Sequence, residues 1–104
     1  MTDHPYPLIR HYEREFTSVA DRDEFIAAID WIKDRITAVN MRYQLLISEQ
    51  NPLKIYEIWS YPDEMTMKWV QQAMEGATAI PDKFSVTTRA DTLHLKAGFE
   101  VEEG

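Results

Sequence analysis

Residues 55–74 read IYEIWSYPDEMTMKWVQQAM, and the spacing of the apolar residues changes within this stretch. Its first part belongs to residues 53–60, in which the residues on both faces of a strand would be apolar except for Glu57. Such a run predicts a central strand that is covered on two faces. Residues 61–64, Tyr-Pro-Asp-Glu, are typical of a helix start, since proline lies at the boundary and acids occupy the first turn. Apolar residues then recur at helical spacing, so we expect a helix over residues 63–75.

The upstream part of the chain contains the same two spacings. Residues 8–16 alternate with a period of two and predict a strand. Residues 22–38 predict an amphipathic helix, for which Asp21 or Asp23 is available as the N-cap. Residues 42–49 predict a strand that forms a β-hairpin with the run described above. The apolar residues of the helix are Phe25, Ile26, Ile29, Ile32 and Ile36, whereas Asp30, Lys33, Asp34 and Arg35 are expected on its solvated side.

The last segment completes a recognisable order of elements. Residues 84–99 are rich in β-forming residues, with a break expected near residues 90–91 and the clearest strand over residues 92–97. The order is thus β-α-β-β-α-β, the split pattern of a ferredoxin-like sandwich. We predict an α+β fold in which a four-stranded antiparallel sheet carries two helices on one face. Because both faces would carry aromatic and aliphatic side chains, we expect a homodimer that stacks sheet against sheet.

The composition bounds the size of the protein and its partners. A chain of 104 residues buries roughly two thirds of its unfolded surface, which suits a single domain with flexible tails at residues 1–6 and 100–104. Its 18 acidic and 11 basic residues give a net charge of −7, which argues against a nucleic acid or an anionic membrane as partner. The absence of cysteine excludes disulfides and thiolate-ligated metals. No apolar run approaches the ~20 residues of a membrane span, so we expect a cytoplasmic protein.

Residues 55–59, the short turn and the helix over residues 63–74 resemble the third strand and second helix of the antibiotic-biosynthesis-monooxygenase family. This family belongs to the dimeric α+β barrel superfamily. The resemblance implies that two sheets pair into a barrel and that a small organic molecule binds between sheet and helices. Some members oxidise polyketide-type phenols with dioxygen and no cofactor, some degrade haem, and others have no assigned reaction.

The sequence departs from the family pattern in the second helix and the first strand. Where the family often has a histidine near the middle of the second helix, this chain has Lys68 and Trp69. A tryptophan of the haem-degrading branch matches Trp69, but no histidine between Trp69 and His94 could serve as the axial ligand. An asparagine expected on the first strand is also absent. Haem binding or degradation is therefore the weaker alternative.

The candidate catalytic residues are His11, His94 and Glu57. His11 shares one strand face with Glu13 and Glu15. We expect the first strand to lie between the third and the fourth, so that Glu57 and His94 lie on the two strands that neighbour it. Two imidazoles and several carboxylates could form a general acid/base site or a weak metal site, and the alternative is a row of cross-strand polar pairs. We expect no metal, since the sequence has no HxH motif and no two ligands at helical i, i+4 spacing.

Glu57 is the more informative of the acids, because it interrupts an otherwise apolar strand. A buried carboxylate is costly unless it is paired or hydrogen-bonded. Either Arg10, Arg14 or Arg42 neutralises it, or it takes up a proton and can pass that proton on.

A group of aromatic residues could wall a pocket for a flat, apolar ligand. The alternative is that these rings are plain core. The predicted substrate-binding residues are Tyr12, Tyr56, Trp59 and Trp69, and Tyr43 belongs with them.

These features predict a homodimer that binds a small hydrophobic or aromatic molecule and oxidises it with no cofactor, metal or flavin. In that reaction His11 or His94 takes a proton from a phenol-like substrate, and the resulting carbanion donates an electron to dioxygen. The alternative from a different class is a non-enzymatic dimer that carries or senses a ligand, or serves as an assembly module.

Overall fold

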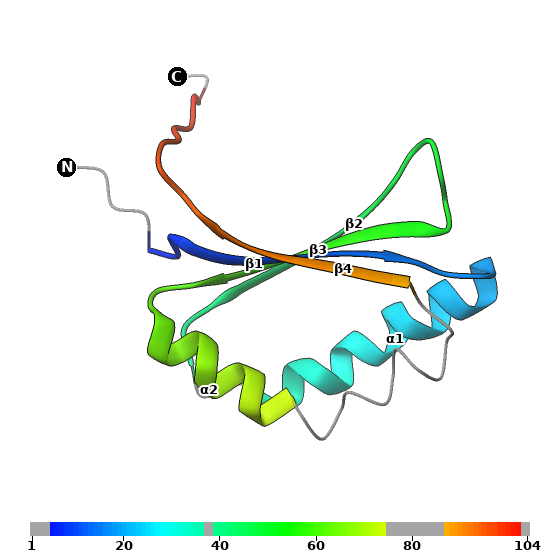
Figure 1. Ribbon diagram of the computed structural model, residues 1–104, viewed down its shortest axis with the longest axis horizontal. Helices are drawn as coiled ribbons and strands as arrows, with labels where there is room; N and C mark the ends of the chain where they lie inside the picture. Colours follow the sequence, from blue (N-terminus) through cyan, green and yellow to red (C-terminus); the bar gives the residue numbers. More distant parts are fainter. Residues whose placement is uncertain (1–4, 37–38, 75–86, 103–104) are drawn as a thin grey trace.

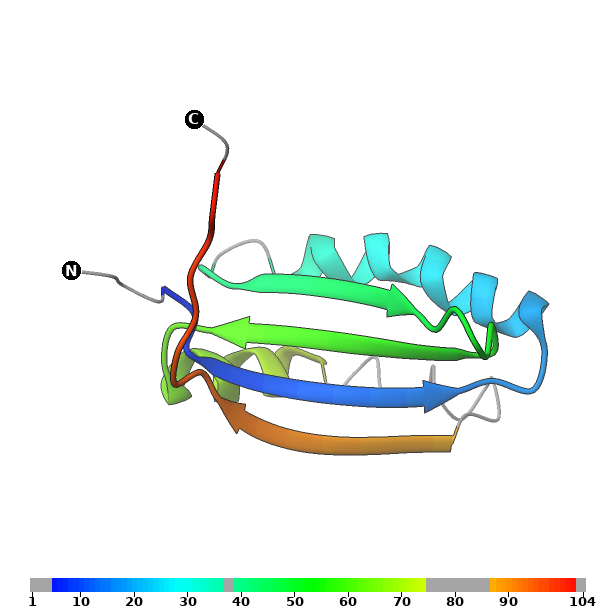
Figure 2. The same ribbon diagram turned by 90° about the horizontal axis from the view of Figure 1, so that it is seen from above.

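The computed structural model describes residues 5–36, 39–74 and 87–102. The strands of this part form one four-stranded sheet in the order β2-β3-β1-β4, and each neighbouring pair is antiparallel. Both helices lie on one face of the sheet, and no described element covers the other face (Figure 1, Figure 2). The predicted ferredoxin-like α+β arrangement is therefore confirmed. In chain order the elements are β1 (Leu8–Glu15), α1 (Val19–Arg35), β2 (Arg42–Ile47), β3 (Lys54–Tyr61), α2 (Glu64–Met74) and β4 (Thr87–His94).

The strand register decides which side chains face the helices. β1 and β3 pair so that Tyr12 lies opposite Glu57. Leu8 and Tyr12 belong to the hydrophobic cluster between the sheet and the helices. Because side chains alternate along a strand, His11 and Tyr56 lie on the opposite, uncovered face. The helix-facing residues of β3 are all buried and are Ile55, Glu57, Trp59 and Tyr61.

Two apolar clusters hold the helices on the sheet. The smaller one joins Phe16, Phe25 and Ile55, with the two phenylalanine rings 5.3 Å apart. Full burial of each such side chain contributes roughly 1.5–3 kcal/mol, so these contacts account for the position of α1. The buried members of the larger cluster are Leu8, Ile32, Ile36, Trp59, Tyr61 and Val70.

The first helix begins ahead of the predicted residue 22. Its N-cap is Ser18, whose Oγ accepts a hydrogen bond from the backbone N–H of Asp21 at 3.1 Å. The expectation of Asp21 or Asp23 as the cap is wrong, because Ser18 has the extended backbone of a cap and Asp21 already lies in the first turn. The predicted end of this helix, at residues 37–38, lies outside the described residues.

The second helix begins close to the predicted position. The Oδ1 atom of Asp63 accepts a hydrogen bond from the backbone N–H of Thr66 at 2.8 Å. This bond lowers the pKa of the Asp63 carboxyl. Asp63 thus caps α2 directly after the proline at the strand end.

The last strand differs from its prediction. It runs without interruption through residues 90–91, which pair with β1, so the expected break there is wrong. It ends at His94, ahead of the predicted end at residue 97. Every residue of this edge strand is exposed. An exposed strand does not need alternating apolar and polar residues, so its sequence does not mark where the strand begins and ends.

Removal of the first cap tests the helix boundary. Ser18→Ala should lower the free energy of unfolding by about 1 kcal/mol, because the N–H of Asp21 loses its acceptor. Asp23→Ala, at an exposed position inside the helix, should change it by less than about 0.5 kcal/mol. Urea unfolding followed by circular dichroism measures both variants, and a larger loss in Asp23→Ala would contradict the assignment of the cap.

Candidate functional site

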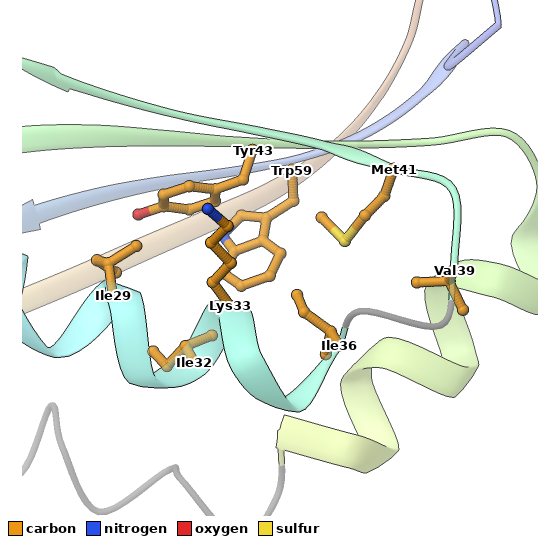
Figure 3. Close-up of a pocket in the computed structure, with 8 residues that line it drawn as sticks. All are labelled: Ile29, Ile32, Lys33, Ile36, Val39, Met41, Tyr43 and Trp59. Carbon is orange, nitrogen blue, oxygen red and sulfur yellow. The ribbon is translucent and has the colours of Figure 1, made fainter.

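A cavity of about 470 Å³ opens between α1 and the strands β2 and β3 (Figure 3). This volume lies within the range of small-molecule sites, about 300–1,000 Å³. Its floor is the helix-facing surface of the sheet, and its side is one face of α1. The lining residues are mostly apolar and are Ile29, Ile32, Lys33, Ile36, Val39, Met41, Tyr43 and Trp59.

Two aromatic rings form the sheet side of the cavity. Tyr43 and Trp59 lie opposite each other on β2 and β3, with ring centroids 4.7 Å apart in an edge-on arrangement of 69°. Trp59 is only 7% exposed, and its Nε1 is buried with no hydrogen-bond partner in the described part of the chain. This N–H is enclosed by protein atoms, so Trp59 contributes the surface of its ring to the cavity.

The hydroxyl of Tyr43 belongs to a buried ionic network. Glu57 is 1% exposed and accepts hydrogen bonds from Arg14 Nε at one carboxylate oxygen and from the Tyr43 hydroxyl at the other. Of the three arginines considered from the sequence, Arg14 is thus the one that neutralises Glu57. Arg10 instead donates to Thr92 Oγ1 at 2.7 Å.

The network keeps the Tyr43 hydroxyl protonated. Burial raises the pKa of Tyr43, and the charge of Glu57 and the hydrogen bond to it raise the pKa further. The hydroxyl therefore donates to Glu57, and its ring is held at the cavity wall. Arg14 is held in turn between rings, with its guanidinium carbon 4.7 Å from the Tyr12 ring centre and 5.3 Å from that of Phe25.

The three predicted catalytic residues lie at three separate places. Glu57 faces the helices, whereas His11 lies on the uncovered face, where its ring stacks on Tyr56 at 5.8 Å. His94 is exposed at the end of β4, opposite Leu8. The two residues lie on either side of β1 and are offset by four residues along it, which places their backbones roughly 16 Å apart.

The predicted carboxylate row on β1 makes polar contacts with β3 and with the turn that precedes it. Glu13 is 3.5 Å from the Nζ of Lys54, and Glu15 accepts a hydrogen bond from Asn51 at 3.4 Å. Within the described ranges, no group of three or more His, Asp or Glu side chains could hold a metal ion. Among the lining residues that the structure describes, none is a histidine that could serve as an axial haem ligand.

Of the predicted binding residues, Trp59 lines the cavity and the others do not. Tyr12 packs in the larger apolar cluster together with Trp59 but is not a lining residue, and Tyr56 lies on the other face of the sheet. Trp69 is 44% exposed on α2. Tyr43, which the sequence grouped with these rings, is part of the lining.

Sequence reasoning missed Lys33 as a cavity residue. It follows Ile29 by four residues and precedes Ile36 by three, which puts it on the edge of the apolar face. The side chain is exposed, as expected, but it rises from α1 toward the Tyr43 ring at the rim of the cavity (Figure 3). The helical spacing was the signal that could have identified it.

Replacement of Arg14 tests the buried network. Arg14→Met should lower the free energy of unfolding by about 3–5 kcal/mol, because Glu57 is left buried and unpaired. The double variant Arg14→Met/Glu57→Gln should be more stable than Arg14→Met, since no charge then remains. Arg10→Met is the matched control, and a loss there as large as in Arg14→Met would contradict the assigned pairing. Urea unfolding followed by tryptophan fluorescence measures all three.

No helix of the described residues is long and apolar enough to cross a membrane. No family model matches the sequence, and no curated protein matches it either. Solved structures do match the fold.

Three of these structures illustrate the likeness. A dimeric ferredoxin-like protein from an uncultured marine organism is 13% identical, with a TM-score of 0.75 over 93% of this chain and 94% of that one. The monooxygenase ActVA-Orf6 of Streptomyces coelicolor, solved with nanaomycin D, is 9% identical, with a TM-score of 0.70 over 96% of both chains. SnoaB, a cofactor-independent oxygenase of Streptomyces nogalater, is 10% identical, with a TM-score of 0.68 over 89% and 96% of the two chains. In fold, the chain is a ferredoxin-like α+β protein of the kind found in antibiotic-biosynthesis monooxygenases.

Proposed function

We propose that the protein is a homodimeric α+β barrel that binds a small hydrophobic or aromatic molecule in the cavity between α1, β2 and β3. The observation that carries this proposal is the cavity itself, about 470 Å³ in volume, with apolar walls and two aromatic rings on its sheet side. Its few polar groups are the ones expected to orient a ligand.

The uncovered face of the sheet supports the homodimer. The outward residues of the two central strands include Ile9, Tyr56 and Ile58, and the outer strands add Leu46 and Leu93, which are 50% and 42% exposed. Apolar side chains gathered on an open sheet face are a surface that a partner can bury. A second copy would use the same face, since interfaces with two-fold symmetry are self-complementary. The dimeric ferredoxin-like structure from the marine organism is in line with this arrangement.

The C-terminal segment adds to the same argument. Residues 95–102 leave the sheet as an extended chain on the side away from the helices (Figure 1). Phe99 and Val101 are 88% and 83% exposed and alternate with acidic residues, which is the pattern of a strand with one apolar face. We propose that this segment packs on the second copy.

A charge on the uncovered face tests the dimer. Sedimentation equilibrium of the wild type should give the mass of two chains. Leu46→Glu should raise the dimer dissociation constant by at least about 100-fold, because symmetry places the new carboxylate in the interface twice. Met65→Glu, at an 81% exposed position on the helix side, should leave the dimer intact. A wild-type monomer, or equal effects of the two substitutions, would contradict the proposed interface.

A second candidate function is that of a cofactor-independent monooxygenase acting on an aromatic or polyketide-like substrate. Two neighbours in fold carry the names of oxygenases, and Tyr43 connects the cavity wall to Glu57. In such a reaction a base removes a proton from a CH₂ group of the substrate, and the carbanion gives an electron to dioxygen. One oxygen atom then becomes the new carbonyl, and the other leaves as water. The proposed bases are His11, His94 and Glu57, of which Glu57 is nearest to the cavity.

Oxygen uptake tests this second function, with dithranol as an anthrone probe. Loss of the base should lower the rate of oxygen uptake by about 100-fold or more. The variants to compare are His11→Ala, His94→Ala and Glu57→Gln. The control is Asp30→Ala, a substitution at an exposed position. A rate that all three substitutions leave unchanged would exclude these residues as the base. If the wild type takes up no oxygen with this probe while it still binds small molecules, the non-enzymatic alternative holds for this substrate class.

A further inference from the structure

We infer that the cavity takes an organic anion, in which an apolar or aromatic body lies against Trp59 and an acidic group contacts Lys33. This inference rests on the proposed small-molecule cavity and adds the charge of its occupant. It follows from the hydrogen-bonding groups of the lining, from the position of one cation, and from the absence of acids among the lining residues that the structure describes.

The polar groups of the lining are donors. Lys33 carries an ammonium group with three N–H donors. The indole N–H of Trp59 is enclosed by protein atoms and is not presented to the cavity. The Tyr43 hydroxyl is engaged with Glu57, which lies behind the ring and is itself paired with Arg14. The described lining side chains thus include no carboxylate and present the donors of Lys33, so they match a ligand group that accepts hydrogen bonds.

Lys33 is the cation placed to meet such a group. Its side chain extends from α1 over the cavity toward the Tyr43 ring (Figure 3). No ion pair to Lys33 lies within 4.0 Å among the described residues, although Asp30 and Asp34 are close to it in sequence. Lys68, by contrast, pairs with Glu64 at 3.4 Å. Lys33 therefore has no internal counter-ion that an anionic ligand would have to displace.

The net charge of the chain does not oppose this assignment. The formal charge of −7 belongs to the chain as a whole. At physiological ionic strength, charges further apart than about 8 Å are largely screened. The charges that remain effective there include Lys33 and its neighbours Asp30 and Asp34 on α1, and of these three Lys33 is the one that lines the cavity. An anion with an apolar body also suits the remaining isoleucine and methionine side chains of the cavity.

A matched pair of fluorescent probes tests the charge of the occupant. Anilinonaphthalene sulfonate and its uncharged parent phenylnaphthylamine share one aromatic body and differ in the sulfonate. Lys33→Gln should weaken binding of the sulfonate by about fivefold, the upper end of what one exposed ion pair contributes. It should change the affinity for the amine by less than about twofold. Lys68→Gln, which removes the same charge from α2, should leave both probes unchanged. Fluorescence titration of the folded dimer measures the affinities.

The NMR signals of the indole N–H groups show where the probe binds. They also distinguish failure of the proposed cavity from failure of the proposed preference for an anion. In a ¹⁵N-labelled protein, the Nε1–H signal of Trp59 should shift on addition of the sulfonate, whereas that of Trp31, which is half exposed outside the cavity, should not. If neither probe shifts Trp59, the proposed cavity function itself fails. If both probes shift Trp59 and Lys33→Gln changes neither affinity, the cavity binds small molecules but the preference for an anion is overturned.

Discussion

A four-stranded sheet has two faces, and two helices cover one of them. Everything else in this structure depends on that constraint. On the covered side, alternate residues of β3 are buried under α1 and α2, and they include both the carboxylate of Glu57 and the indole of Trp59. On the uncovered side, the intervening residues Tyr56 and Ile58 lie in the middle of the sheet with no described element over them. The cavity belongs to the first side and the proposed dimer to the second, so one strand serves both.

The network of Arg14, Glu57 and Tyr43 connects three neighbouring strands under the sheet. A buried ion pair contributes little net stability relative to apolar residues of the same size, because desolvation offsets much of the attraction. The network of these three residues instead fixes the alignment of the strands. A shift of the register by one residue would turn Glu57 away from both partners, so the pairing of β1, β2 and β3 is held at one alignment. The same contacts hold the Tyr43 ring at the cavity wall.

The order of elements could be predicted from the sequence because the apolar spacing changes clearly at each junction of strand and helix. The position of the site could be predicted only in part. The expected sheet order was right, but His11 and Glu57 lie on opposite faces because Tyr12, not His11, is the register partner of Glu57, and register is not readable from one sequence. Tyr56 and Trp59, however, differ by an odd number of residues on one strand. Residues an odd number apart on a strand point to opposite faces of the sheet, so these two side chains cannot line a single cavity.

The central claim is that the uncovered sheet face is buried by a second copy of the chain. Isotope-filtered nuclear Overhauser spectroscopy on a mixture of ¹³C-labelled and unlabelled protein measures this directly, because it detects contacts between chains alone. The account predicts cross-peaks from the methyl groups of Ile58 and Leu46 of one chain to aromatic protons of the other. Cross-peaks that instead involve the exposed residues of α1 and α2, or none at all in a sample shown to be dimeric, would contradict it.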